Sequence, residues 1–127
     1  MNLENLRQDI EVYLSTNFTA HPIRYENVPF TIPDNTPWVS CHIKRGGLTQ
    51  EEFANTGYEV FGVLILQVFT PLNKGMNESN TISDSLATLF ERVNVGTVWF
   101  SHPDINDVGP DNNWYQVNIS IPFSRKT

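Results

Sequence analysis

Apolar residues are densest in residues 58–71, and this stretch predicts the central strand of a sheet. A two-residue period divides its apolar side chains between two faces, with Leu64, Leu66 and Val68 on one face and Val63 and Ile65 on the other. We therefore expect both faces of this strand to be covered. The flanking glycines, Pro71 and the many β-branched and aromatic residues favour a strand over a helix.

Two other segments have apolar residues at helical spacing. Residues 3–18 predict a first helix, whose apolar face consists of Leu3, Leu6, Ile10, Tyr13 and Leu14. It should end near Asn17, because a residue that precedes a proline, here His21, is pushed out of the helical region. A second helix is marked by Ile82, Leu86, Leu89, Phe90 and Val93. Three possible N-caps leave its start open: Asn77, Ser79 and Asn80.

Alternating side chains predict two half-buried strands, at residues 38–44 and 114–123. The inward residues of the first are Val39, Cys41 and Ile43, and its outward residues are Ser40, His42 and Lys44. The inward residues of the second are Tyr115, Val117, Ile119, Ile121 and Phe123, and its outward residues are Gln116, Asn118 and Ser120. Pro122 restricts this position to an edge strand or to the end of a strand.

Short strands are expected at residues 23–25 and 97–100, and three connections are long. Residues 28–37 contain three prolines and predict an extended loop. Residues 45–56 are polar and predict a connection before the central strand. Residues 101–113 predict an irregular connection, with a brief strand at 105–108 left open. Long loops in a compact domain are usually functional or mobile.

The order of elements predicts the α+β class, with a mixed, mostly antiparallel sheet and two helices packed on one face. The 127 residues fit a single domain, residues 1–127. If the central strand and the strand near Val98 are parallel, the second helix can form a right-handed crossover between them.

The composition excludes some classes of protein. A net charge of −6 argues against sequence-specific nucleic-acid binding, because phosphate neutralisation needs a basic surface. Cys41 is the single cysteine, so an intramolecular disulfide is excluded and a reducing cytosol fits. We expect a soluble, intracellular protein, since no signal peptide and no span of about 20 apolar residues is visible.

No set of residues predicts catalysis, a cofactor or a metal site. A ligand triad of His21, His42 and His102 is a weak alternative, because two of these histidines precede prolines and the third lies on a polar strand face. The acidic segment 104–111 lacks the glycine and the glutamate of a calcium-binding EF-hand loop. Cys41 alternates into the apolar face and is most simply a core residue. Trp114 shares a face with polar residues and is a candidate interface residue.

Taken together, several stretches resemble the tail terminator-like proteins of long-tailed bacteriophages and prophages. The resemblance rests on the N-terminal amphipathic helix, residues 24–30 and 37–39, the apolar strand at 58–69, Gly75 before a helix with Ile82-Ser83-Asp84, and the final stretch 114–123. It covers nearly the whole chain in the expected order, through patterns of core and turn residues.

The resemblance implies a virion structural protein, assembled in the host cytoplasm and located in the tail. Such a subunit closes into a homohexameric ring on the head-proximal end of the tail tube, stops its growth and presents a surface for head-tail joining. The implied partners are its own copies, the tail tube protein and the connector protein. DNA passes through the ring without sequence-specific binding, and neither a membrane nor a small-molecule substrate is involved. The acidic charge fits this passage.

Contacts between subunits and with the tube are expected from the two polar connections and from polar strand residues. The candidate interface residues are Arg24, Lys44, Arg45, Glu51, Glu52, Glu59, Gln67, Asp104, Asp107 and Trp114. The main alternative function is a head-tail connector, a completion protein or a related ring component of a tail-like machine. An enzyme or a ligand-binding module is the remaining alternative.

Overall fold

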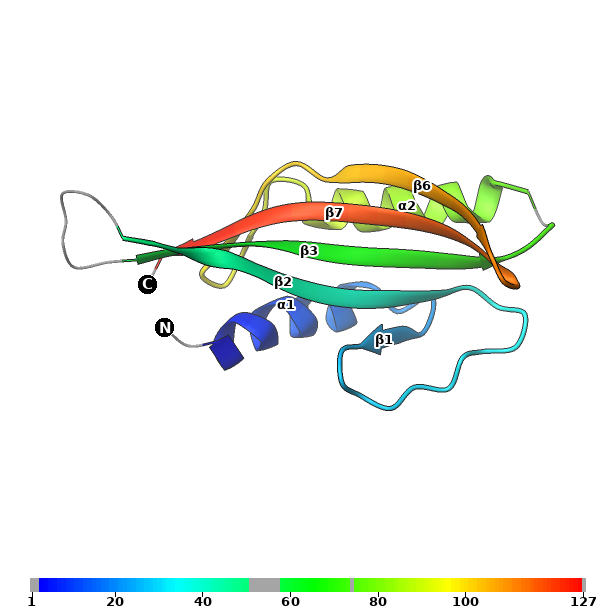
Figure 1. Cartoon of the computed structure of the whole chain (residues 1–127), viewed down its shortest axis with the longest axis horizontal. Helices are drawn as coiled ribbons and strands as arrows, with labels where there is room; N and C mark the ends of the chain where they lie inside the picture. The colour runs from blue at the N-terminus through cyan, green and yellow to red at the C-terminus, as the bar shows by residue number, and fades with distance from the viewer. Residues whose placement is uncertain (1–2, 51–57, 74, 127) are drawn as a thin grey trace.

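The computed structural model describes residues 3–50, 58–73 and 75–126. This part of the chain contains two helices and seven strands (Figure 1). In chain order they are α1 (Leu3–Asn17), β1 (Ile23–Tyr25), β2 (Trp38–Gln50), β3 (Tyr58–Pro71), α2 (Asn77–Phe90), β4 (Asn94–Val95), β5 (Val98–Phe100), β6 (Asp104–Asp111) and β7 (Trp114–Lys126). Neither helix is long and apolar enough to cross a membrane, among the residues described.

The strands form one curled sheet in the order β1-β2-β3-β7-β5-β4, and β6 pairs with the other end of β7. Only β1 and β2 are parallel among the described pairs, so the expected α+β fold with a mostly antiparallel sheet is confirmed. Because β3 and β5 are both antiparallel to β7, they run in the same direction. Helix α2 therefore connects two parallel strands, with β7 inserted between them.

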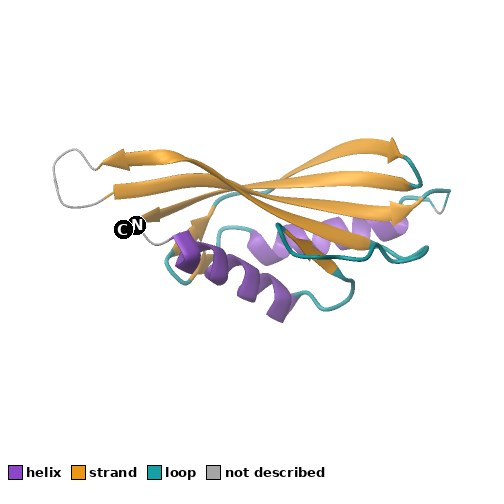
Figure 2. Cartoon of the chain, turned by 60° about the horizontal axis from the view of Figure 1, so that its bottom comes forward, coloured by secondary structure: helices purple, strands orange, loops and turns teal. Residues whose placement is uncertain are grey.

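Both helices pack on one side of the sheet, as predicted (Figure 2). The helical apolar faces meet the inner face of the central strands in one core, which includes Leu6, Ile10, Leu14, Leu64, Leu66, Val68, Ile82, Leu86 and Phe90. Each large apolar side chain buried there stabilises the fold by about 1.5 to 3 kcal/mol. The Tyr13 hydroxyl also donates a 2.8 Å hydrogen bond to the Leu89 carbonyl, which ties α1 to the last turn of α2.

The opposite face of the sheet, called here the outer face, differs from the expectation for β3. Val63 and Ile65 point to this face and are only half-buried. No helix of the described part of the chain covers them (Figure 2). The apolar run suggested that both faces of β3 are covered, but within the described part of the chain helices cover only its inner face (Figure 2).

Strand β2 is longer than its alternating segment, because it continues to Gln50 with a register shift between Arg45 and Gly47. The prediction of a polar connection from residue 45 is therefore wrong for residues 45–50, and residues 51–56 lie outside the described part. The bulge fits tightly against β3. A Cβ on Gly62 would lie 2.4 Å from Cζ of Phe123 and 2.5 Å from the Lys44 carbonyl oxygen.

The irregular connection predicted for residues 101–113 contains the eight-residue strand β6. It pairs with β7 and joins it through a tight turn in which Asn112 has a φ of 56°. The alternative of a brief strand at residues 105–108 was therefore correct in predicting a strand, but the strand is longer and covers Asp104–Asp111. Three aspartates, a glycine and a proline have low strand propensity, and pairing with a strongly apolar neighbour overrides it.

Pro122 lies inside β7, so its expected restriction to an edge or strand end is wrong. Strand β6 pairs with β7 up to Ser120 and β5 pairs from Phe123, which leaves Pro122 between them. Its carbonyl accepts a 2.9 Å hydrogen bond from the Ser101 N–H, so the missing Pro122 N–H faces the same side. The Ser101 carbonyl accepts the Arg92 N–H instead, at 3.2 Å.

Helix α2 begins at Asn77, and its N-cap is Met76, which makes no side-chain capping hydrogen bond. The suggestion that Asn77, Ser79 or Asn80 caps this helix is therefore wrong. Ser79 instead lies buried on the inward face of the helix.

Candidate assembly interface

A row of polar residues crosses the outer face through five strands. Cross-strand pairing aligns Arg24, Ser40, Gln67, Asn118 and Asn106 from β1 to β6. We call these five residues the polar row. Arg24 and Asn106 are exposed at its two ends, and the three residues between them are buried or half-buried. The row therefore offers its polar groups mainly at the two edges of the sheet.

Hydrogen bonds occupy the middle of the polar row. His42 lies beside it, and its Nε2 is 2.9 Å from Ser40 Oγ and 3.1 Å from Gln67 Oε1. Gln116 Nε2 donates to Asn118 Oδ1 at 2.8 Å. Gln67, one of the predicted interface residues, is therefore half-buried and hydrogen-bonded within the sheet. Its side-chain oxygen is already occupied by His42 and is less available to a partner protein.

An aromatic cluster covers the outer face at the end of the sheet near the 26–37 loop. Trp38 stacks on Phe69 with ring centroids 4.2 Å apart, and Phe30 lies 5.5 Å away. Trp114 meets Trp38 edge-on at 6.1 Å. Trp114, predicted as an interface residue, is therefore half-buried and helps to bury Trp38.

At the other end of the sheet, two aromatic side chains of the outer face are exposed. Trp99 of β5 and Phe61 of β3 both pair with Ser124 of β7, so the three residues form a short row. Trp99 is 41% exposed and Phe61 is 43% exposed. Neither residue was among the interface residues predicted from the sequence.

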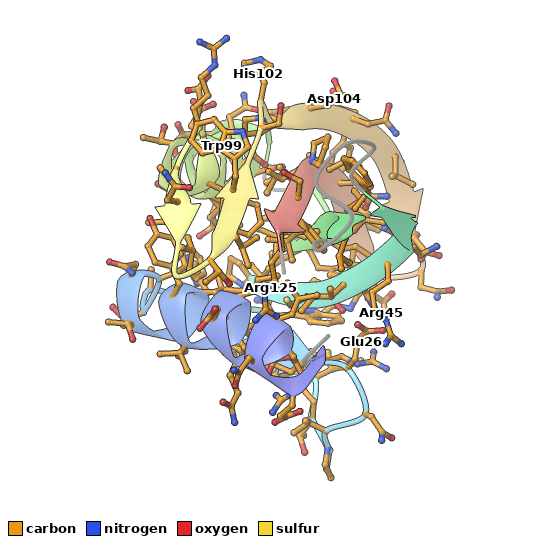
Figure 3. All side chains as sticks on the ribbon, turned by 90° about the vertical axis from the view of Figure 1, so that its left-hand side faces the viewer. Glu26, Arg45, Trp99, His102, Asp104 and Arg125 are labelled. Atoms are coloured by element: carbon orange, nitrogen blue, oxygen red, sulfur yellow. The ribbon has the colours of Figure 1, made fainter. Side chains whose placement is uncertain are left out.

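Two predicted basic residues lie in β2 on opposite faces of the sheet. Lys44 is exposed on the outer face beside Val63, whereas Arg45 pairs with Gly62 and belongs to the inner face by alternation. Arg45 is exposed and lines a pocket of about 230 Å³ at the edge of β2 (Figure 3). Acidic and basic residues of α1 and the 26–37 loop complete its charged lining: Glu4, Arg7, Glu11 and Glu26.

Charged residues are exposed on two edge strands of the sheet, β6 and β1. Asp104, Asp107 and Asp111 are exposed on β6, and Arg24 is exposed on β1. None of these four residues has an ion-pair partner among the residues described. Figure 3, viewed along the strands, shows Asp104 on one edge of the curled sheet and Glu26, which follows β1, on the other.

Comparison with known proteins adds family information to this geometry. The family model described as phage tail terminator protein matches residues 5–123. The chain belongs to the phage tail terminator family. The resemblance found in the sequence is thereby confirmed, and the protein is a structural component of a phage tail.

A solved structure has the same fold as this tail terminator family member, with a TM-score of 0.77. The two chains are 18% identical, and the alignment covers 98% of this chain and 96% of the other. No curated protein sequence matches the chain.

Three predicted interface residues of this tail terminator family member are Glu51, Glu52 and Glu59. Glu51 and Glu52 lie outside the described residues. Glu59 lies in β3, where its backbone pairs with Thr49 and Lys126, and its side chain is not described. The remaining candidates divide between the outer face and the two edges, and the structure does not gather them at one point.

Chemically reactive groups are not assembled into a site in the described part of the tail terminator domain. Burial raises the pKa of the Cys41 thiol to about 12, which keeps it protonated and unreactive. His42 is bonded to Ser40 and Gln67, and His102 Nδ1 lies 2.9 Å from Glu91 Oε1, so these histidines have separate local partners. The acidic segment 104–111, which was compared with a calcium-binding loop, is instead an extended strand paired with β7.

Proposed function

We propose that this protein closes into a homohexameric ring on the head-proximal end of the tail tube. The ring ends tube polymerisation and forms the surface to which the head connector docks. Membership of the tail terminator family, matched over residues 5–123, is the observation that carries the proposal. Assembly in the host cytoplasm precedes incorporation into the virion tail.

The surface of the domain supports contacts between successive copies. Strands β1, β6 and β4 are edge strands of its described sheet, and its outer face carries the exposed aromatic residues Phe61 and Trp99. An interface between two different patches of the same chain generates a ring when the rotation between copies closes. These features fit the partners that we propose, which are further copies of the chain, the tail tube protein and the head connector.

DNA passage is the remaining part of the proposal. A net charge of −6 disfavours retention of the polyanion, because few phosphates would be neutralised. We therefore propose that DNA passes through the ring without sequence-specific contacts.

The first test combines solution mass with tail assembly. Light scattering over a range of protein concentration, with electron microscopy of large species, should show a ring of about six subunits, in solution or on tails assembled without this protein. Adding the protein should stop tube elongation and allow such tails to join heads. Tails of normal length that still fail to join heads would instead indicate a connector or completion role. Uncontrolled elongation after addition would contradict the proposal.

A further inference from the structure

We infer that the β6 edge of one subunit pairs, antiparallel, with the β1 edge and the adjoining 26–37 loop of a second copy of this chain. The inference rests on the proposed ring and names the two surfaces that would meet in it. Three observations support it: the position and direction of the edges, their exposed apolar residues, and their charges.

The two edges lie on opposite sides of the sheet at the same level along the strands. Arg24 of β1 and Asn106 of β6 are the two ends of the polar row, which crosses β2, β3 and β7 between them. Figure 1 shows β6 along the upper edge and β1 with the 26–37 loop along the lower edge, in the same half of the molecule. A copy placed beside the first at the same height would bring these edges together.

The strand directions permit regular pairing. Strand β1 is parallel to β2, and each following neighbour across the row is antiparallel to the one before it. Strand β6 therefore runs opposite to β1. In a neighbouring copy of the same orientation, β1 would run antiparallel to β6 and extend the sheet by main-chain hydrogen bonds.

Both edges expose apolar side chains that a packed neighbour would bury. Val28 and Ile32 of the 26–37 loop and Ile105 and Val108 of β6 are 43% to 52% exposed. These four residues are half of the large hydrophobic residues exposed in the described part of the chain. Their concentration at two edges, with the loop ordered by Pro29 and Pro33, is typical of a surface with a partner.

One pair of opposite charges favours this pairing, whereas the 26–37 loop itself contributes two exposed acidic residues, Glu26, which accepts a hydrogen bond from the Ile43 N–H, and Asp34. Arg24 and Asp104 both lie on the outer-face side of their strands, since they pair with Ser40 and Ser120. When Arg24 lies opposite Asn106, Asp104 is its diagonal neighbour, within reach of an arginine side chain. The alternative role of the β6 aspartates is to keep an exposed edge from aggregating. That role needs no basic partner.

Charge reversal distinguishes these two roles. Arg24→Glu or Asp104→Arg alone should weaken ring formation by about tenfold or more, because an attractive contact becomes a like-charge one. The double variant Arg24→Glu/Asp104→Arg should restore assembly to within about threefold of the wild type. Arg92→Glu and Asp84→Arg, exposed after the end of α2 and on α2, are matched controls and should assemble normally.

Cysteine cross-linking tests the register directly. Arg24→Cys is combined in turn with Asp104→Cys, Asn106→Cys or Val108→Cys, and buried Cys41 should not interfere. Each double-cysteine variant is oxidised in concentrated solution and also after it has been added to tails that were assembled without this protein. For at least one pair, oxidation should give a ladder of covalent multimers. The control pair Arg92→Cys/Asp84→Cys should give none.

The outcomes separate this inference from the proposed function. Rings of wild-type mass in both single reversals, with no cross-linked ladder from any of the three pairs, would overturn the edge pairing and leave the ring intact. A wild-type protein that forms no multimer, either alone or on tails, would refute the ring itself.

Discussion

Gly62 is the position at which a single added methyl group should be most damaging. A Cβ added there would make two contacts well below 3.0 Å, one with the Phe123 ring and one with the Lys44 carbonyl oxygen. The ring is buried and packs edge-on against Phe100, with centroids 5.9 Å apart, while the carbonyl belongs to the strand next to the bulge. Neither neighbour can move without disturbing the core or the sheet.

The magnitude follows from two opposing terms. Overpacking in a tightly packed site typically costs about 1 to 3 kcal/mol. Replacing glycine by alanine recovers roughly 0.4 to 1 kcal/mol by restricting the unfolded chain. We therefore expect Gly62→Ala to lower the free energy of unfolding by about 1 to 2 kcal/mol, and the Tm by roughly 3 to 10 °C.

A double-mutant cycle with Phe123→Leu tests the cause. Urea denaturation followed by circular dichroism, at concentrations where the protein is monomeric, measures each unfolding free energy. The free-energy cost of Gly62→Ala should fall by about half when the aromatic side chain of Phe123 is replaced, because the contact with the Lys44 carbonyl oxygen remains.

Gly75→Ala is the matched control, since Gly75 has a φ of 75° and nothing lies within 4 Å of a Cβ there. Its cost, about 1 to 2 kcal/mol from the left-handed backbone, should not depend on residue 123. A Gly62→Ala protein as stable as the wild type would refute the steric reasoning. So would a cost that is unchanged in the Phe123→Leu background.

Three further predictions concern single interactions. Tyr13→Phe should lower the free energy of unfolding by about 0.5 to 1.5 kcal/mol, measured by urea denaturation, because the Leu89 carbonyl loses its hydrogen bond; an unchanged midpoint would contradict this. Met76→Asp should add about 0.3 to 1 kcal/mol of stability and so raise the Tm, because a carboxylate at the start of α2 interacts favourably with the helix dipole; a lower Tm would argue against it. The pKa of Cys41 rises from 9.0 to about 12 on folding, so the native state holds this proton more tightly than the unfolded state. Stability should therefore be complete below pH 9 and decrease as the pH rises towards 12, and Cys41→Ala should flatten that part of the pH profile.

The elements that depend on local periodicity were predictable. The described apolar faces of both helices and the inward positions of β2, β3 and β7 are those indicated by spacing, because a side chain's direction follows from its position in a helix or strand. The exception is Val93, which was predicted for the second helix and lies beyond its end at Phe90. The same regularity indicated the fold class. The two helices could be placed on one face because each has a single apolar stripe.

Pairing between distant segments was not predictable from the same signal. Residues 45–50 and 104–111 read as polar connections, yet each forms a strand because β3 and β7 provide hydrogen-bonding partners along their length. Pro122 reads as a strand end, and only the gap between β5 and β6 makes it acceptable inside β7. The residues predicted from the sequence as interface candidates include Arg24, Asp104 and Asp107, but not the exposed apolar residues near them, such as Val28 and Ile105, which only the structure shows to be exposed.

The sequence by itself determined the helices, the buried faces of the long strands and the family, because these depend on periodic patterns and on their order along the chain. The tertiary structure alone decided which residues lie in one row across the sheet. Arg24 and Asn106 are far apart in the chain, and they end the same row only because β2, β3 and β7 pair in one register between them. That register is fixed by burying one face of β3 against two helices, since a slip of one residue would turn its core side chains outward.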